Sequence, residues 1–441
     1  MTHEAIALLM FLSLMVLMMT GQRVFAAIGF VAAIMALVGY GVGGEELAFN
    51  QAFKLFRWTA LVALPLFVFM GYVMARSGIA EDLYRMFHVW FGRVPGGLAV
   101  GTVFLMVVIS AMNGLSVAGM AIGATIALPE MLRRGYDKVL VTGVVQGGSS
   151  LGILIPPSVV MILYSAIAGQ PVDRLWIAGI VPGLLMAGMF VVYILIRARL
   201  NPALAPPATD ADLDMPLGAK LALARAGILP LLIFGAMIGL FLGGVTFLHE
   251  SAAIGALATM IAAAVKRRLT WAMLRESAER TLAISCLFMW IILAALAFST
   301  VFDGLGAVRA IEALFITRWD LSPWEVIILM QLSFLLLGMF FDDTAMLVIV
   351  APLYIPLVRM LDLGFDSVRD QMIWFGVLYT MTCQIAYITP PFGYNLFLMR
   401  GMAPAEVTLW DIYRSIWPFV GMMALTIALV MLFPQIALVL L

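Results

Sequence analysis

The sequence predicts an all-α membrane protein made of two related halves, each with a helix interrupted at a Pro-Pro pair. Three observations support this fold class: an apolar composition, apolar stretches long enough to cross a bilayer, and an internal repeat. Of the 441 residues, 64% are hydrophobic and only 11% are charged. A water-soluble surface needs far more charge, so lipid must be the solvent for most of the chain. A membrane barrel would show short alternating segments, which are absent.

Apolar stretches of about 20 residues, the length of a spanning helix, occur along the whole chain. They include residues 5–21, 24–40, 176–196, 226–248 and 415–433. No Lys or Arg precedes the first stretch, and the second begins only a few residues after it. We therefore expect the first stretch to be a retained span, not a signal peptide, and residues 1–57 to form N-terminal scaffold helices.

Residues 78–92 combine apolar and charged side chains at helical spacing, which predicts an amphipathic helix. Such a helix either lies in the membrane surface as an arm or contacts a partner, and both interpretations stay open here. Tryptophans near predicted span ends are typical of interfacial anchors. Six of the ten tryptophans lie at such ends: Trp58, Trp90, Trp176, Trp319, Trp324 and Trp410.

The first repeat is expected over residues 58–200. Residues 98–132 are largely apolar, with a polar tip near Asn113 and Gly114, which predicts a hairpin. The next apolar stretch, 139–168, contains a Pro156-Pro157 pair. Proline has no backbone N–H and pushes the preceding residue out of the helical region, so this helix should break within the membrane.

Residues 201–222, rich in Pro, Ala and Asp, predict a cytoplasmic linker between the halves. Scaffold helices are expected over 223–280 and the second repeat over 281–441. The second repeat contains its own hairpin, 326–361, with a polar tip at residues 342–344.

The two repeats share their short motifs and their spacing. Gly135-Tyr136-Asp137 corresponds to Gly364-Phe365-Asp366, and Pro156-Pro157 corresponds to Pro390-Pro391. In both halves a tryptophan follows 20 positions after the first proline of the pair.

The positions of Lys and Arg predict the orientation, because cytoplasmic loops carry the excess of positive residues. With the N-terminus outside and two hairpins that enter and leave on the same side, 18 of the 25 Lys and Arg residues fall in cytoplasmic loops. Both termini are then periplasmic, and the two re-entrant hairpins enter from opposite sides. The halves are therefore predicted to be inverted.

The breaks are candidate binding sites, because carbonyl groups freed from a helix within the membrane must face protein, water or a ligand. Carbonyl and hydroxyl oxygens suit Na⁺, and the N-terminus of a half-helix suits an anion. The candidate cation ligands are Asn113, Gly114, Ser116, Ser149, Ser150, Gly152, Pro156, Asp342, Asp343, Thr344, Thr389, Pro390 and Gly393. The candidate contacts of an anionic substrate are Pro157, Ser158, Pro391 and Asn395. The opposing interpretation, that the prolines only kink structural helices, is weakened by two equivalent breaks that each have a polar hairpin tip.

Asp342 and Asp343 lie between two apolar runs. A carboxylate within the membrane is a functional candidate by default. At a hairpin tip exposed to water, however, an aspartate costs little and caps the following helix. Both interpretations remain open.

The sequence lacks the motifs that other classes of function require. It contains no Walker motif, no His/Glu metal cluster and no nucleophile motif, so neither an enzyme, a cofactor nor a metal other than Na⁺ is expected. A net charge of zero gives no reason to expect a nucleic acid partner.

The sequence resembles the large membrane subunit (DctM-like) of tripartite ATP-independent periplasmic (TRAP) transporters over nearly its whole length. Matching stretches are Gly78-Ile79-Ala80-Glu81, Arg134-Gly135-Tyr136-Asp137, Gly152-Ile153-Leu154-Ile155-Pro156-Pro157-Ser158 and Thr389-Pro390-Pro391-Phe392-Gly393-Tyr394-Asn395. The resemblance implies an elevator-type Na⁺ symporter for a small organic anion, a carboxylate or a sulfonate, in the bacterial inner membrane. It also implies a small four-helix membrane subunit and a periplasmic substrate-binding protein as partners. The family's site residues correspond to the hairpin tips and Pro-Pro loops given above.

This sequence departs from the family pattern at the first hairpin tip, where Leu115 and Gly119 replace the usual Ser and Asp. One alternative to the TRAP subunit is an autonomous Na⁺/carboxylate symporter of related fold, which needs no binding protein. Another is an integral-membrane enzyme or assembly factor.

Overall fold

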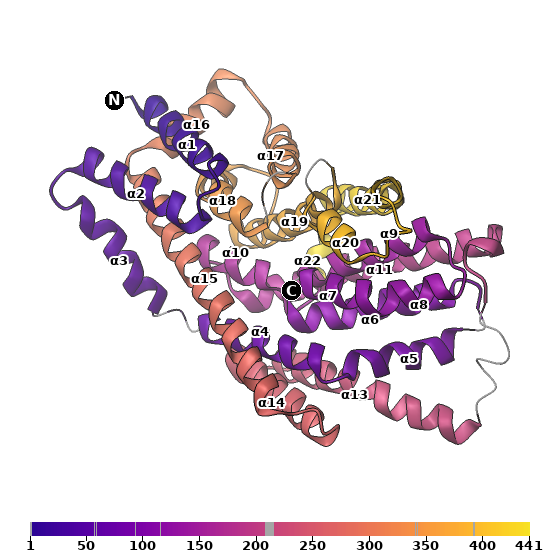
Figure 1. Ribbon diagram of the computed structural model, residues 1–441. Coiled ribbons are helices and arrows are strands. Elements are labelled where there is room, and N and C mark those ends of the chain that lie inside the picture. The colour runs from indigo at the N-terminus through magenta and orange to yellow at the C-terminus, as the bar shows by residue number, and fades with distance from the viewer. Residues whose placement is uncertain are drawn as a thin grey trace.

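A computed structural model describes residues 2–56, 58, 60–92, 94–114, 116–207, 216–339, 341, 343–390 and 393–441. Every regular element within these ranges is a helix (Figure 1). Five of the helices are long and apolar enough to cross a membrane, or six if a bent pair is counted as one span. The all-α prediction is therefore confirmed for the described part of the chain.

The N-terminal part and the first repeat form the following elements, including a π-helix (η1) and two 3₁₀ turns (η2, η3): α1 (His3–Met19), α2 (Val24–Tyr40), α3 (Gly44–Phe56), α4 (Ala60–Arg76), α5 (Ile79–Phe91), α6 (Gly97–Asn113), α7 (Ser116–Ile122), η1 (Gly123–Ala127), α8 (Leu128–Arg133), α9 (Lys138–Ser150), η2 (Leu151–Ile153), α10 (Val159–Ala168), α11 (Val172–Leu200) and η3 (Pro202–Leu204).

The C-terminal part follows in the same order, with a second π-helix (η4): α13 (Leu217–Leu242), α14 (Leu248–Val265), α15 (Trp271–Gly304), α16 (Ala307–Glu312), η4 (Ala313–Arg318), α17 (Pro323–Gly338), α18 (Asp343–Met360), α19 (Val368–Ile388), α20 (Tyr394–Met402), α21 (Leu409–Leu432) and α22 (Gln435–Leu438). Helix α13 begins within the predicted linker 201–222, and the predicted boundary at residue 280 falls inside α15.

The two repeats have the same order of elements. A long helix with an elbow (α4–α5, α15–α16) precedes a helical hairpin (α6–α8, α17–α18), an interrupted helix (α9–α10, α19–α20) and a closing helix (α11, α21). The glycines that begin the two matched motifs, Gly135 and Gly364, both have a φ of 79°, a left-handed conformation that glycine adopts without steric cost.

The repeats pack against each other reciprocally. Helix α10 packs on α18 while α20 packs on α7, and α9 packs on α21 while α11 packs on α19. This is the pattern expected of two halves related by a two-fold axis. The direction of the halves relative to a membrane stays a prediction.

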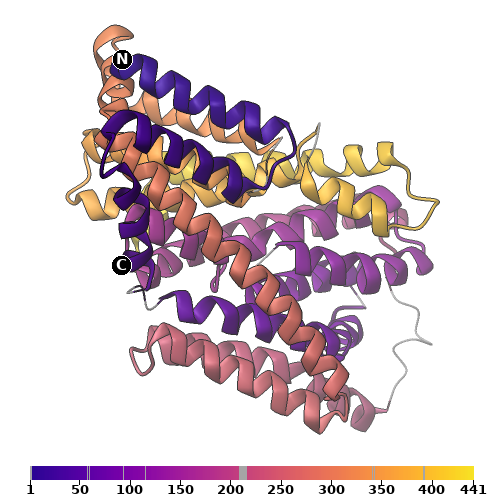
Figure 2. The same cartoon turned by 60° about the vertical axis from the view of Figure 1, so that its left-hand side comes forward.

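Helix α15 crosses the molecule, from α1–α3 at one end to α14 at the other, in both views (Figures 1 and 2). It packs on α2, α3 and α4, while α14 packs on α4 and α13 packs on α5. Among the interrupted helices, α10 contacts α4 and α15, whereas α9 packs on α6 and α21, and α19 packs on α17 and α21.

The tryptophan prediction is only partly correct. Trp90 and Trp410 are 60% and 72% exposed, as an interfacial anchor would be. Trp176 is instead fully buried, where its indole Nε1 donates to the carbonyl oxygen of Ser158 at 3.3 Å. Its ring also meets Phe67 and Phe241 edge-on, so it is a core residue that supports the first helix break.

Candidate functional site at the two helix breaks

The first break follows Ser150, where α9 tightens into the 3₁₀ turn η2 before the chain leaves the helix at Leu154. Helix α10 then starts at Val159, capped by Ser158, whose Oγ accepts from the N–H of Met161 at 3.2 Å and donates to the carbonyl of Ile153. The segment around Pro156 and Pro157 is thus unwound, and one hydroxyl joins its two sides.

The tip of the first hairpin packs directly on this break. At the tip, Gly114 has a φ of 67°, and its carbonyl accepts from the N–H of Val159 at 3.2 Å. A Cβ at position 114 would lie 3.0 Å from the carbonyl oxygen of Pro157, so the close approach of the two backbones favours glycine.

The second break follows Ile388, where α19 ends and Thr389 takes an extended conformation. The carbonyl of Thr389 accepts from the N–H of Gly393 at 3.1 Å, and α20 starts at the next residue. A Cβ at Gly393 would lie 2.8 Å from the oxygen of Thr389, so this turn also has no room for a side chain.

One hydrogen bond joins the first hairpin to the second break. The amide Nδ2 of Asn395, in the first turn of α20, donates to the Oγ of Ser116, the first residue of α7, at 2.9 Å. Both side chains are buried. The bond spans 279 residues of sequence and brings together two residues that were predicted separately, one as a cation ligand and one as a substrate contact.

A second bond joins the two interrupted helices to each other. Gln384 in α19 is buried, and its Nε2 donates to the carbonyl of Ser150, the last residue of α9, at 2.9 Å. The hydroxyls of Ser149 and Ser150 donate back to the carbonyls of Gln146 and Gly147. Each hydroxyl oxygen still has a lone pair that can face a ligand.

Ser110, on the α6 arm of the hairpin, faces both the α7 arm and the first break, and sequence reasoning missed it. A Cβ at Gly152 would lie 2.0 Å from the Cβ of Ser110, and a Cβ at Gly119 would lie 1.7 Å from its Oγ. Gly119 is one of the two positions that depart from the family pattern. The side chain of Ser110 fills the space that a side chain at position 119 would need.

The first hairpin tip and the two helix breaks together are called the junction below. Four buried oxygen atoms in and near it have no hydrogen-bond partner within the described part of the chain: Ser110 Oγ, Gln146 Oε1, Gln384 Oε1 and Asn395 Oδ1. Leaving such an oxygen unsatisfied costs about 1–3 kcal/mol, so a ligand, an ion or water is expected to meet it. Gln146 and Gln384 were also missed, although a glutamine within an apolar run was a usable signal.

The oxygens are carried by amides and hydroxyls. Across the residues that the structure describes, no group of three or more His, Cys, Asp or Glu side chains is arranged to hold a metal ion. Neutral oxygen ligands suit a hard ion of low charge, and the positive ends of the α10 and α20 helix dipoles favour an anion. At α10, the N–H groups of Val159 and Met161 are already bonded to Gly114 and Ser158.

Not every predicted site residue is described. Asp342 and Pro391 lie outside the described residues, and for Asn113, Asp343 and Thr344 only the backbone, at the end of α6 and the start of α18, is described. The structure brings together the described remainder at the first hairpin tip and the two breaks: Gly114, Ser116, Ser149, Ser150, Gly152, Pro156, Pro157, Ser158, Thr389, Pro390, Gly393 and Asn395. Whether these residues bind an ion or a substrate stays a prediction.

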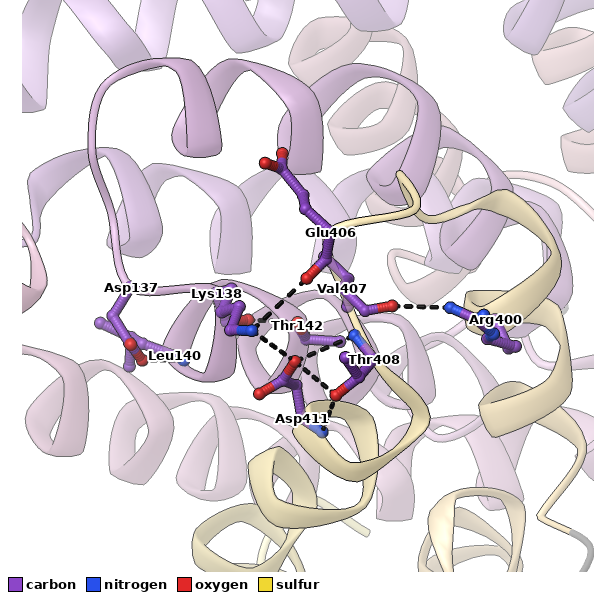
Figure 3. Close-up of polar contacts among 9 residues, drawn as sticks. All are labelled: Asp137, Lys138, Leu140, Thr142, Arg400, Glu406, Val407, Thr408 and Asp411. Atoms are coloured by element: carbon purple, nitrogen blue, oxygen red, sulfur yellow. Dashed lines mark hydrogen bonds and ion pairs between the residues drawn. The ribbon is translucent and has the colours of Figure 1, made fainter.

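The junction is braced where α9 and α21 begin (Figure 3). Lys138 Nζ pairs with the Oδ2 of Asp411 at 2.7 Å, and Asp411 also forms a capping box with Thr408. Arg400, in the last turn of α20, donates to the carbonyl of Val407 at 2.7 Å. Further along, Gln146 Nε2 donates to Ser415 Oγ at 3.1 Å, so polar contacts fix the register of the two helices.

Comparison with known proteins places this chain among membrane permeases. Residues 11–436 match the family described as the DctM component of tripartite ATP-independent periplasmic transporters. The C4-dicarboxylate TRAP transporter large permease protein DctM of Pseudomonas aeruginosa is 31% identical over 399 residues, which cover 89% of each chain. The ectoine TRAP transporter large permease protein TeaC of Halomonas elongata is 29% identical over 413 residues, covering 92% of this chain and 93% of that protein.

A solved structure has the same fold. The crystal structure of the YdaH transporter of Alcanivorax borkumensis superposes with a TM-score of 0.65 and 16% identity, covering 92% of this chain and 96% of that one. At this identity the likeness concerns the fold alone.

Proposed function

The chain belongs to the DctM component family of tripartite ATP-independent periplasmic transporters, and we propose that it couples uptake of a small organic anion to the entry of Na⁺. Its relatives are large permease subunits of TRAP transporters, not enzymes. They are named for C4-dicarboxylates and for ectoine, so the family leaves the substrate open. A carboxylate or a sulfonate is our proposal, because the positive dipole ends of two half-helices favour a negative group.

The observation that carries this proposal is the hydrogen bond between Asn395 and Ser116. It places the oxygen-rich start of α20 against the first hairpin tip, which itself packs on the first break. Asn395 Oδ1 and the oxygens of Ser110 and Gln384 are left without partners in the described chain. Na⁺ bound among such neutral oxygens would add the charge that draws an anionic substrate to the same junction.

The family is one component of a tripartite system, so the proposed partners are a small four-helix membrane subunit and a periplasmic binding protein that delivers the substrate. The proposed location is the inner membrane, with both termini periplasmic. An elevator movement is the proposed mechanism, in which the hairpins and interrupted helices move together against α1–α4 and α13–α15. The polar contacts of α9 with α19 and α21, and of α7 with α20, support this, since they connect the two halves into one unit.

Uptake into proteoliposomes tests the coupling. The chain is reconstituted with its small subunit, and the loaded binding protein is added outside under an inward gradient of Na⁺ or of K⁺. We expect uptake only with Na⁺ and only with the binding protein. Uptake that persists in Na⁺-free buffer would exclude the coupling, and uptake of free substrate without the binding protein would favour an autonomous symporter. A thermal-shift screen of the binding protein against organic acids identifies the substrate.

Variants of the junction test the site. Asn395→Ala and Ser116→Ala are each expected to raise the Na⁺ concentration for half-maximal uptake about tenfold, the effect of one lost buried hydrogen bond of about 1.4 kcal/mol. Asn201→Ala is the matched control, because Asn201 caps a short turn after α11. The same assay on Asp342→Asn separates a cation ligand from a helix cap: unchanged Na⁺ activation would leave Asp342 only the capping role.

A further inference from the structure

A cavity of about 370 Å³ lies away from the two breaks, between α5 and the base of the first hairpin. Its lining consists mainly of charged side chains: Glu81, Tyr84, Arg85, His88, Ile126, Glu130, Arg133 and Arg134. The hydroxyl of Tyr84 lies 3.5 Å from the carbonyl oxygen of Ala127 and joins α5 to the hairpin at the inner wall. The volume is within the usual range of ligand pockets.

Two charged side chains that line this cavity, Glu81 and Arg85, form no ion pair within the described part of the chain. Glu130 is taken by Arg133 and Arg134, with N···O distances of 2.8 and 2.7 Å. Glu81 and Arg85 are four positions apart on α5, a spacing that suits an ion pair, yet neither forms one within the described part of the chain. The Oε2 of Glu81 is buried there without a hydrogen-bond partner.

The buried oxygen of Glu81 calls for a donor, and the exposed Arg85 beside it offers a positive charge, so a ligand with charges of both signs fits. A buried carboxylate oxygen without a donor is costly, and an ammonium group with its N–H donors relieves that cost. The guanidinium of Arg85 is matched by the oxygens of a phosphate, and the exposed Arg133 beside it adds positive charge. A phosphate linked to a primary ammonium by a short chain has both groups.

The surroundings of the cavity are consistent with the level of lipid headgroups. Helix α5 bends by 63° from the apolar α4 and buries Leu83 and Phe87 on one side. Trp90, near its end, is exposed, as in helices that lie along a membrane surface. Arg133, in the last turn of α8, lines the cavity, and basic pockets between membrane helices are known to bind phospholipid headgroups.

We propose that this cavity binds the headgroup of phosphatidylethanolamine, with the phosphate on Arg85 and Arg133 and the ammonium on Glu81. Phosphatidylcholine carries the same phosphate, but its quaternary nitrogen has no N–H to give to Glu81 Oε2, and phosphatidylglycerol carries no cation. The site therefore distinguishes the three lipids by the group that follows the phosphate. The inference is independent of the substrate and of ion coupling.

Native mass spectrometry of the full-length chain in detergent tests the assignment, with the three lipids offered at equal concentration and with equal acyl chains. We expect phosphatidylethanolamine to be retained about tenfold more than phosphatidylcholine, the value of one charge-assisted hydrogen bond. Glu81→Gln should remove this preference, and Arg85→Gln should weaken retention of all three lipids. Arg275→Gln is the matched control, since Arg275 is exposed and paired with Glu279 on α15.

Equal retention of the ethanolamine and choline lipids by the unsubstituted chain would overturn the proposal, and so would an unchanged preference in Glu81→Gln. Glu81→Asp is a second variant that keeps the negative charge, so it should keep part of the preference for the ethanolamine lipid. If this variant retained none of the three lipids while its melting temperature was unchanged, the assigned ion pair would be contradicted. Displacement of the lipid by water-soluble glycerophosphoethanolamine at equal concentration would overturn the assignment to a membrane lipid, because the acyl chains would then contribute nothing.

Discussion

Gly78 and Gly306 adopt the same left-handed backbone conformation, with φ and ψ of 73° and 13° at Gly78 and of 77° and 13° at Gly306. They form the elbows where α4 turns into α5 and α15 turns into α16. Each elbow is held by a basic side chain from outside its own repeat. Lys266 Nζ donates to the carbonyl of Gly78 at 2.6 Å, and His3 Nδ1 lies 2.8 Å from the carbonyl oxygen of Leu305.

Alanine at either elbow is expected to destabilise the protein, because a left-handed conformation costs a residue with a Cβ about 1–2 kcal/mol. The loss should be larger at Gly306, where the new Cβ would lie 2.5 Å from the ring of His3, than at Gly78, where the nearest atom is 3.6 Å away. The melting temperature in detergent measures it. Gly421→Ala in α21 is the control, since nothing lies within 4 Å of that position. Equal melting temperatures for all three variants would show that neither elbow requires glycine.

Lys266 should stabilise the first elbow through two contacts. Besides its bond to Gly78, it forms an ion pair with Asp82, and both side chains are largely buried. Lys266→Met removes both contacts and is expected to cost about 1–3 kcal/mol, since a partly buried charge is left unpaired. Arg275→Gln breaks an exposed pair on α15 and should cost under about 0.5 kcal/mol. The two variants differ in burial, so equal losses in thermal unfolding would contradict the role of Lys266.

The larger features of the fold were predictable because local chemistry determines them. Single prolines stay inside helices here, as Pro182 does in α11, but two adjacent prolines each lack the N–H that the helix needs. The breaks near Pro156 and Pro390 therefore followed from the sequence. The hairpin tip at Asn113 and Gly114 followed from one polar interruption of an apolar run. In the described residues, helices lie on either side of each predicted tip and each half has an interrupted helix, while the re-entrant nature of the hairpins stays a prediction.

The contacts that assemble the site were not predictable in the same way. Gln384 meets Ser150 across 234 residues and Asn395 meets Ser116 across 279, and no local pattern indicates which buried amide faces which carbonyl. Trp176 shows the same limit. Its position near a span end is shared with exposed tryptophans, and only the packing of α11 against the first break decides that it is buried.

Ser110 allows a sharp test of packing at the first break. Gly119→Ala would place its Cβ 1.7 Å from Ser110 Oγ and 3.0 Å from Ser110 Cβ, and Gly152→Ala would place its own 2.0 Å from Ser110 Cβ. Both variants are expected to lose uptake and several degrees of melting temperature, since overpacking a core costs about 1–3 kcal/mol.

Adding Ser110→Gly distinguishes the two positions. At Gly119 the nearest remaining atom of residue 110 is its Cα at 3.6 Å, so stability should recover. At Gly152 the backbone carbon and the Cα of residue 110 remain at 2.7 and 2.8 Å, so stability should not recover. Recovery of both double variants, or of neither, would show that Ser110 is not packed as described.

The pair between Lys138 and Asp411 should contribute through two separable effects (Figure 3). Lys138→Met removes only the ion pair, and because Lys138 is 43% exposed the loss is expected to stay below about 1 kcal/mol. Asp411→Ala also removes the bonds from the N–H and hydroxyl of Thr408, and the loss of this half of the capping box adds about 0.5–1.5 kcal/mol. In chemical unfolding, the double variant should cost less than the sum of the two single ones, since both remove the same pair.

Exchanging the two residues, Lys138→Asp with Asp411→Lys, restores the pair but not the cap, so its stability should lie between those of the two single variants. A stability equal to that of the unsubstituted protein would mean that the capping box at Thr408 contributes nothing to the start of α21.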